Sequence, residues 1–258
     1  MTKDLESDLD REKRKYNTVA STEVVSPSRS NSKLNLLEIS EWHRDPFSKY
    51  YEAIKKIVNP SMVVLELGAG CGNHTAVICE TKAKVFALDI SEKSLAVCRS
   101  LFQDVHTILG NIENIPIDDN SIDVLLSCGS LSYGNHEKVK KEIFRVLKPG
   151  GSLIILDSLN HNRFYRINRW IHYKRGRRTL STLQRMPNHK LIQDLAAPFS
   201  ESEVKYFGSY LWFTLILRKI IGNKLARKID IALERRLPSK LGAFKFLLIC
   251  EKISEAKS

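Results

Sequence analysis

The sequence predicts an α/β fold in which helices cover both faces of a mostly parallel sheet. Short apolar runs alternate with segments of helical periodicity between residues 46 and 158. Strict alternation of strands and helices requires crossover connections, and these give parallel strands. The runs VVLEL, VFALDI, VLLS and LIIL are apolar almost throughout. Such strands are typical of a sheet that is buried on both sides.

The expected elements follow one another in chain order. Aromatic and aliphatic residues at helical spacing predict a first helix over residues 46–58, ended by Asn59 and Pro60. Seven strands are expected, the last two after a long irregular stretch. They are residues 62–67, 84–89, 105–109, 122–127, 152–157, 204–207 and 243–250. Further helices are expected near residues 75–80, 91–102, 136–147 and 225–237.

The chain length of 258 residues fits one large domain or two small ones. Residues 1–40 mix charges with Ser, Thr and Asn without a sustained period, so we interpret them as a mobile arm with one short helix near its start. Residues 41–258 are expected to form a single domain. A basic, aromatic-rich stretch at about 158–200 interrupts the alternation and is interpreted as an insertion.

The positive charge is concentrated in one segment. The net charge is +12, and between Asp157 and Asp194 there are nine Lys and Arg residues and no acid. Such a segment is expected to face an anionic partner, which could be a phosphate-bearing ligand, an acidic membrane surface or a nucleic acid. The first fifteen residues lack the apolar stretch of a signal peptide, so we expect a cytoplasmic protein. Five scattered cysteines without a CxxC spacing indicate reduced thiols rather than a metal site.

A glycine-rich loop follows the first expected strand. Gly68, Gly70 and Gly72 allow a sharp turn and a close approach of the backbone to a ligand. A dinucleotide site of the G-x-G-x-x-G type would need glycine at position 73, where this chain has Asn73. The spacing therefore argues against NAD or FAD.

Two further positions indicate a nucleoside. Asp89 ends the second expected strand, where a carboxylate can accept both hydroxyls of a ribose. A helix cap is the alternative role of this residue, although Ser91 suits the cap better. After the third expected strand, the Asn111 amide oxygen could accept from an adenine amino group, and the Ile112 N–H could donate to a ring nitrogen.

Together these residues resemble the class I S-adenosylmethionine-dependent methyltransferases. The resemblance covers about residues 40–158 and lies in four motifs: ELGAGCG, the strand end ALD, the loop GNIENIPIDDNSID and the turn LKPGG. It implies a Rossmann-like sheet of seven strands, with the last strand inserted antiparallel.

The resemblance also implies roles for individual residues. The three glycines would cradle the methionine part of S-adenosylmethionine, Glu66 would brace the loop, and Asp89 would hold the ribose. The family usually has Asp where this chain has Asn111, but an amide can still accept the same hydrogen bond. The expected cofactor-binding residues are Glu66, Gly68, Ala69, Gly70, Gly72, Asp89, Ile90, Asn111, Ile112 and Ser127. The expected product is S-adenosylhomocysteine, and no metal is expected.

Methyl transfer requires alignment of the acceptor, the methyl group and the sulfur, and a hydroxyl acceptor also gains from a general base. His161 follows the fifth expected strand and is our candidate base. Asp157 is the second candidate, either as the base or as the group that orients His161. Cys128 lacks the neighbours typical of cytosine C5 methylation and is interpreted as a core residue.

The second half of the chain resembles methyltransferases of bacterial O-antigen and other polysaccharide gene clusters. That resemblance implies O-methylation of a nucleotide-sugar or a lipid-linked glycan. Tyr133, Arg163, Arg166 and Arg169 are expected to bind the anionic acceptor, and the basic helix could also contact the inner face of an anionic membrane. An RNA methyltransferase that uses residues 161–190, and a cofactor-binding protein without catalytic activity, remain as alternatives.

Overall fold

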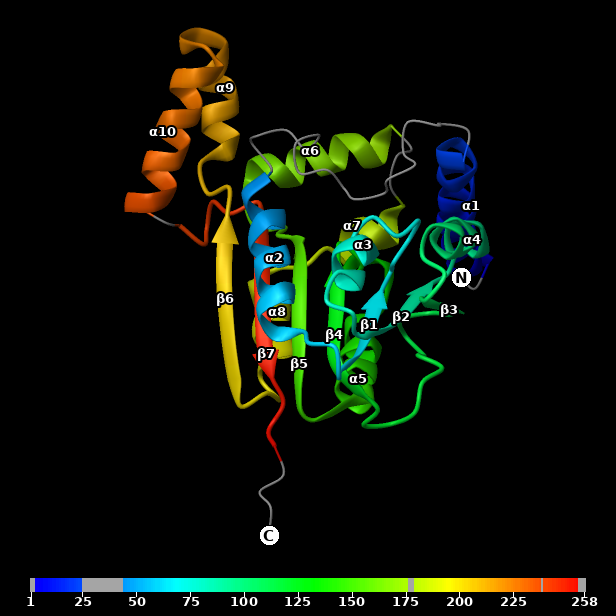
Figure 1. Cartoon of the computed structure of the whole chain (residues 1–258). Coiled ribbons are helices and arrows are strands. Elements are labelled where there is room, and N and C mark those ends of the chain that lie inside the picture. Colours follow the sequence, from blue (N-terminus) through cyan, green and yellow to red (C-terminus); the bar gives the residue numbers. More distant parts are fainter. Residues whose placement is uncertain (1–2, 25–43, 176–178, 238, 255–258) are drawn as a thin grey trace.

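The computed structural model describes residues 3–24, 44–175, 179–237 and 239–254. These residues form a seven-stranded sheet in the order β3-β2-β1-β4-β5-β7-β6, with helices on both faces (Figure 1). Strand β7 runs antiparallel to both of its neighbours, and every other pair is parallel. The expected fold class is confirmed, including the antiparallel insertion of the last strand.

The strands agree closely with those expected from the apolar runs. They are β1 (Val63–Leu67), β2 (Lys84–Asp89), β3 (His106–Leu109), β4 (Ile122–Cys128), β5 (Leu147–Ser158), β6 (Glu201–Phe207) and β7 (Lys245–Glu251). The main difference is at β5, where residues 147–151, expected to be a turn, are the irregular beginning of the strand.

The described residues form ten α-helices. They are α1 (Lys3–Val24), α2 (Arg44–Ile57), α3 (Thr75–Cys79), α4 (Glu92–Leu101), α5 (His136–Val146), α6 (Arg163–Lys174), α7 (Leu180–Gln184), α8 (His189–Ala196), α9 (Leu211–Ile221) and α10 (Asn223–Arg236), with the 3₁₀ turn η2 (Leu131–Tyr133). Buried side chains of α2, α3 and α4 pack on one face, and those of α5 and α8 pack on the other.

The N-terminal segment differs from the mobile arm that the sequence predicts. Residues 3–24 form one helix of 22 residues, α1, which lies beside α4. The Glu12 carboxylate is buried and accepts a hydrogen bond from the Thr182 hydroxyl at 3.1 Å. The Asn17 side-chain oxygen accepts from the Ser91 hydroxyl at 2.7 Å. These contacts hold α1 on the domain. The rest of the expected arm, residues 25–40, lies outside the described residues.

Three helices lie at the edge of the sheet where the parallel strands end. Helix α6 follows β5 and crosses above that edge in Figure 1. Because β5 and β6 both run antiparallel to β7, β6 ends at the same edge, and α9 and α10 follow it as a projecting hairpin. Within the described residues, no helix combines the length and apolar character needed to cross a bilayer.

Candidate functional site

A pocket lies at the carboxyl ends of β1, β2 and β4 and encloses about 220 Å³. Its walls come from the loop after β1, the tip of β2, the loops after β3 and β4, and helix α1. The lining residues are Tyr16, Gly68, Ala69, Gly70, Asn73, His74, Leu88, Asp89, Ile90, Gly110, Asn111, Ile112, Cys128, Gly129, Ser130 and Tyr133. Parallel α/β sheets commonly bind ligands at this edge.

The loop after β1 requires glycine for two separate reasons. Gly68 has a φ of +70°, and a Cβ there would approach the Ser130 Cβ to 2.7 Å. Gly70 has a φ of +55°, but a Cβ there would meet no atom within 4 Å. Position 68 therefore requires glycine both for its packing against Ser130 and for its backbone angle. Gly70 leaves its open side toward the pocket.

Gly72 has a different role from the one expected of it. Its φ is +90°, and a Cβ there would lie 2.7 Å from a ring carbon of Phe102 and 3.2 Å from the Cys98 sulfur. It does not line the pocket. Gly72 thus allows the loop to pack against the end of α4. The wall of the pocket is formed instead by Gly68, Ala69 and Gly70.

Asp89 is fixed at the tip of β2 by backbone donors. One carboxylate oxygen accepts from the Ser91 N–H at 2.8 Å, and the other accepts from the Gly70 N–H at 2.9 Å. Burial raises the pKa of Asp89, while the hydrogen bonds from Ser91, Gly70 and Ile90 act in the opposite direction. Each oxygen keeps acceptor capacity for a ligand. Asp89 and Ile90 both line the pocket at the tip of β2.

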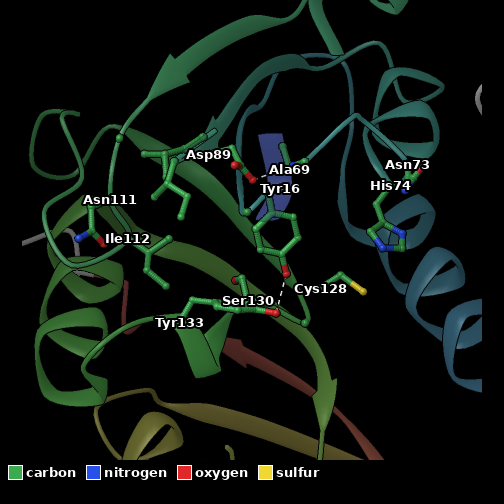
Figure 2. Close-up of a pocket in the computed structure, with 16 residues that line it drawn as sticks. Tyr16, Ala69, Asn73, His74, Asp89, Asn111, Ile112, Cys128, Ser130 and Tyr133 are labelled. Carbon is green, nitrogen blue, oxygen red and sulfur yellow. Dashed lines mark hydrogen bonds between the residues drawn. The ribbon is translucent and has the colours of Figure 1, made fainter. Parts of the chain in front are cut away.

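Asn111 and Ile112 lie on one side of the pocket, away from His74 and Cys128 (Figure 2). The Asn111 side-chain oxygen accepts from the Glu113 N–H at 3.0 Å and has a second lone pair available. The Ile112 side chain is buried and packs in the core. Both residues line the pocket, and their contact with adenine stays a prediction.

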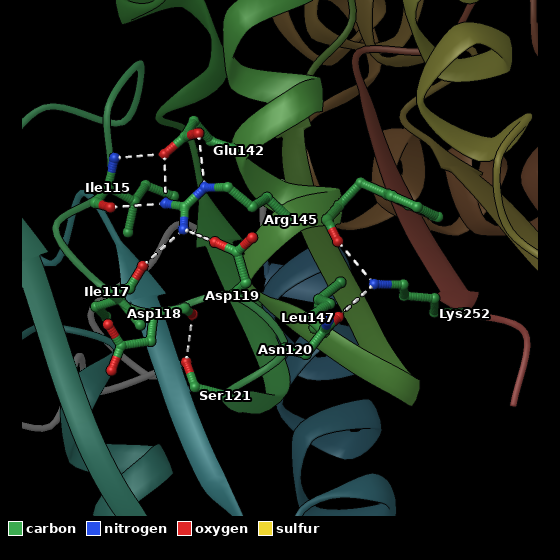
Figure 3. Close-up of polar contacts among 11 residues, drawn as sticks. Ile115, Ile117, Asp118, Asp119, Asn120, Ser121, Glu142, Arg145, Leu147 and Lys252 are labelled. Carbon is green, nitrogen blue, oxygen red and sulfur yellow. Dashed lines mark hydrogen bonds and ion pairs between the residues drawn. The ribbon is translucent and has the colours of Figure 1, made fainter. Parts of the chain in front are cut away.

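The loop that carries Asn111 is clamped to α5 by Arg145 (Figure 3). The Arg145 guanidinium donates to the carbonyl oxygens of Ile115 and Ile117, both at 2.8 Å. It also contacts the carboxylates of Glu142 and Asp119 at 2.7 and 2.6 Å. Glu142 in turn accepts from the Ile115 N–H at 2.7 Å. This network fixes the loop between β3 and β4.

The opposite side of the pocket contains His74, which the sequence analysis did not identify. Its Nδ1 shares a hydrogen bond of 2.9 Å with the Tyr51 hydroxyl, and its ring stacks on Phe47. Burial, assisted by the positive charge of Lys245, lowers the pKa of His74 to about 4. The imidazole is therefore neutral at neutral pH. Its position directly after the glycine loop was the available sequence signal.

Cys128 also lines the pocket, on the side of His74. Burial raises the pKa of its thiol to about 12, against the opposing effect of Lys245. The thiol is therefore protonated and unsuited to act as a nucleophile. All five cysteines of the chain are free thiols.

Two tyrosines meet inside the pocket. The Tyr16 hydroxyl donates to the Tyr133 hydroxyl at 2.5 Å, and the rings meet edge to face with centroids 5.7 Å apart. Burial raises the pKa of Tyr16, so its phenol keeps its proton at neutral pH. Tyr133 was expected at an acceptor site and does line the pocket. The sequence gives no sign that Tyr16 lines a pocket, because the composition of this segment predicts an arm and not a packed helix.

The structure does not bring the two expected catalytic residues to the pocket. His161 is exposed, and its ring lies against His189 of α8 with centroids 4.5 Å apart. Asp157 is buried and accepts from the backbone N–H groups of Leu131 and Ser158 at 3.1 and 2.6 Å. Neither residue lines the pocket. Asp157 instead fixes the beginning of η2, the turn that carries Tyr133.

Two expected cofactor contacts also lie behind the pocket wall. The Glu66 carboxylate is 2% exposed and accepts from the Thr75 hydroxyl at 2.5 Å, so it braces the loop as expected. The Ser127 hydroxyl is buried and shares a hydrogen bond of 2.6 Å with the Ser130 hydroxyl. Of these residues, only Ser130 lines the pocket.

The three arginines expected to bind the acceptor differ in their exposure: one is buried and two are on the surface. Arg169 is 5% exposed, and it donates to the Leu159 carbonyl at 2.8 Å and to the Asn160 side chain at 3.0 Å. It fastens α6 to the end of β5. Arg163 and Arg166 are exposed on α6, and none of the three lines the pocket.

We predict that Arg145→Met lowers the free energy of unfolding by about 2 kcal/mol, because buried acceptors lose charged hydrogen bonds. Urea denaturation measures the change. Lys141→Met, on the exposed side of the same helix, is the control and should shift the unfolding midpoint little. Equal midpoints for the two variants would show that the clamp does not stabilise the loop.

We predict that Glu66→Gln removes a pH dependence of stability. Burial raises the pKa of Glu66 from 4.5 to about 8, with a further contribution from the Asp89 charge and opposed by the Thr75 hydrogen bond. The pKa of Glu66 is higher in the folded protein than in the unfolded chain. The contribution of this carboxyl group to the free energy of unfolding is therefore complete below pH 4.5 and is lost as the pH rises to 8.

The loss in the wild type amounts to about 1.4 kcal/mol per pH unit at most. Urea denaturation at pH 5 and pH 8 should therefore show that the variant gains stability relative to the wild type at the higher pH. Glu52→Gln, at an exposed position of α2, should show no such gain. A constant difference between Glu66→Gln and the wild type at both pH values would refute the raised pKa.

Comparison with known proteins shows that part of the chain is similar in sequence to methyltransferases. Residues 65–155 match the model of a methyltransferase domain. An uncharacterized methyltransferase of Schizosaccharomyces pombe is 35% identical over 127 residues, which are 48% of this chain and 47% of that protein. A ubiquinone/menaquinone biosynthesis C-methyltransferase of Wigglesworthia glossinidia brevipalpis is 34% identical over 109 residues, 38% of this chain and 44% of that protein. The chain spans about half the length of the curated relatives it matches.

Similarity of fold extends over more of the chain. The geranyl diphosphate C-methyltransferase of Streptomyces coelicolor has a TM-score of 0.59 at 13% identity, over 88% of this chain and 84% of that chain. A phosphoethanolamine N-methyltransferase of Haemonchus contortus has a TM-score of 0.56 at 16% identity, over 81% of this chain and 53% of that chain. The chain therefore shares the fold of these methyltransferase structures, and its residues 65–155 match the model of a methyltransferase domain.

Proposed function

We propose that this protein is an S-adenosylmethionine-dependent methyltransferase and that the pocket at the ends of β1, β2 and β4 holds the cofactor. The observation that carries the proposal is the Asp89 carboxylate, which two backbone N–H groups fix at the tip of β2 beside the open side of Gly70. Sequence similarity to methyltransferases supports it. So do structures of the same fold in complex with S-adenosyl-L-methionine or S-adenosylhomocysteine.

The charges in the pocket fit a cationic cofactor. Asp89 is the one acidic residue among the residues that line it, and no Lys or Arg is among them. A pyrophosphate-bearing ligand would need basic partners, whereas a sulfonium gains from a nearby carboxylate. When bound, S-adenosylmethionine supplies a methyl group on a positively charged sulfur. Gly68, Ala69 and Gly70 would accommodate its methionine part, and Asn111 and Ile112 its adenine.

We further propose that the acceptor is a hydroxyl of a sugar, carried by a nucleotide or by a lipid. The pocket offers neutral polar groups, namely the His74 imidazole on the side opposite Asn111 and the paired hydroxyls of Tyr16 and Tyr133 in its middle (Figure 2). Such groups can hold and orient a hydroxyl without binding a charge. Alignment of this kind is the main contribution that a protein makes to methyl transfer.

His74 takes the place that the sequence analysis gave to His161. It is the histidine that lines the pocket, and Tyr51 and Phe47 fix its ring. With a pKa lowered to about 4 by burial, it is a weak base. Its proposed role is therefore to hold the acceptor hydroxyl by a hydrogen bond.

We predict that Asp89→Asn weakens S-adenosylmethionine binding at least tenfold, which is about 1.4 kcal/mol or more, because the substitution removes the charge and one hydrogen-bond acceptor. Isothermal titration calorimetry measures the dissociation constant. Asp104→Asn, an exposed change after α4, is the matched control and should leave it unaltered. Unchanged affinity in Asp89→Asn would show that the ribose does not bind there.

We predict that His74→Gln lowers turnover at least tenfold and changes the dissociation constant of the cofactor less than threefold, whereas His161→Gln keeps turnover near that of the wild type. The assay follows a radiolabelled methyl group into nucleotide-sugars, lipid-linked glycans and RNA. Melting temperatures check that both variants fold. Loss of turnover in His161→Gln alone would restore that residue as the catalytic one, and label in RNA alone would support the alternative acceptor.

A further inference from the structure

Large apolar side chains are exposed on three helices at the carboxyl edge of the sheet. Of fourteen such side chains in the described part of the chain, three lie on α6, three on α9 and two on α10. On α9, Phe213, Ile216 and Ile220 recur at helical spacing and are 41%, 56% and 79% exposed. On α6, Phe164 and Trp170 are each more than half exposed. Side chains at this spacing form an apolar stripe.

The same helices expose positive charge and little negative charge. Nine exposed Lys and Arg residues lie on α6, α9 and α10, among them Arg218 and Lys219 in the last turn of α9. The two acidic residues of these helices, Asp230 and Glu234, point inward. Asp230 is 2% exposed and accepts from Thr214 at 2.9 Å, and Glu234 accepts from the Ser209 N–H.

Helix α6 and the hairpin α9–α10 are joined into one unit. The Phe164 ring of α6 stacks on the Trp212 ring of α9 with centroids 4.3 Å apart and planes 5° apart. The Tyr165 hydroxyl donates to the Gly208 carbonyl, just before α9, at 3.1 Å. Both segments lie beyond the edge of the sheet at which the pocket opens (Figure 1). We call the exposed side of α6, α9 and α10 the hairpin surface.

We propose that the hairpin surface binds the interface of an anionic lipid bilayer. Apolar side chains flanked by Lys and Arg allow a helix to lie in such an interface, the apolar part among the acyl chains and the cations at the lipid phosphates. Binding there brings the pocket edge of the domain to the membrane. If the proposed function holds, this favours a lipid-linked acceptor over a freely diffusing nucleotide-sugar.

Two other partners fit this surface less well. Single-stranded RNA would stack its bases on aromatic rings, but five of the eight large apolar side chains exposed on these helices are aliphatic, among them Ile220, the most exposed. A second copy of the chain that docked through the same surface would bring two basic surfaces together, with repulsion between like charges. An anionic bilayer can bind the basic side chains through its lipid phosphates and the aliphatic side chains among its acyl chains.

Sedimentation with vesicles tests the proposal. The full chain should bind vesicles of phosphatidylcholine with phosphatidylglycerol at least tenfold more tightly than vesicles of phosphatidylcholine alone. The double variants Arg218→Gln/Lys219→Gln and Ile216→Asp/Ile220→Asp should each weaken binding to the anionic vesicles about tenfold or more. The matched controls are Lys55→Gln/Lys56→Gln, at the exposed C-terminal end of α2, and Ile253→Asp, which follows β7 at the opposite edge of the sheet and is 62% exposed. Both should bind as the wild type does.

Several results would overturn the proposal. They are absence of binding to anionic vesicles, equal losses in the controls, binding of RNA but not vesicles, and a dimer in light scattering that the isoleucine variant dissociates. Melting temperatures and S-adenosylmethionine affinity are measured for every variant. Vesicle binding without cofactor binding would refute the proposed function but leave the membrane surface standing, and the reverse result would do the opposite.

Discussion

The hydrogen bond from the Gly70 N–H to the Asp89 carboxylate is the contact on which the pocket depends. It joins the loop after β1 to the tip of β2, two neighbouring parallel strands. The N–H groups of Gly68 and Ala69 both donate to the Leu88 carbonyl and hold the same loop against β2. Because the carboxylate is half-buried and accepts from backbone donors, its position is fixed before any ligand binds. A fixed acceptor reduces the cost of ordering the site on binding.

The distribution of charge separates two surfaces with opposite preferences. Asp89 is the acid among the residues that line the pocket. Burial raises the pKa values of Tyr16, which also lines the pocket, and of Glu66 behind its wall, so both hold their protons at neutral pH. His74 is neutral because burial lowers its pKa. The pocket therefore favours a cation. The hairpin surface carries the exposed Lys and Arg residues and favours an anionic partner. The net charge of +12 describes neither surface.

Local sequence predicted the parts of the site that depend on neighbouring residues. Gly68, Gly70 and Asp89 were identifiable because a strand end and a tight turn constrain residue type at short range. The same reasoning failed for Gly72, whose partner Phe102 lies thirty positions later in the chain. It also failed for Tyr16, because a polar helix without a strong apolar stripe gives no sign that it will pack over a pocket.

Proximity along the chain to the end of β5 does not bring His161 or Arg169 to the wall of the pocket. Both follow the end of β5 closely, yet one side chain turns to His189 of α8 and the other satisfies the backbone carbonyl of Leu159. A chain that leaves a strand end must satisfy its own polar groups, and that requirement decided the role of Arg169. The topology nevertheless restricts where the inserted segments lie. Since β5 and β6 point the same way, everything added after either strand emerges at the edge where the pocket opens. Additions at these two points are thus the ones that can bring a partner to the pocket without disturbing the loops that form it.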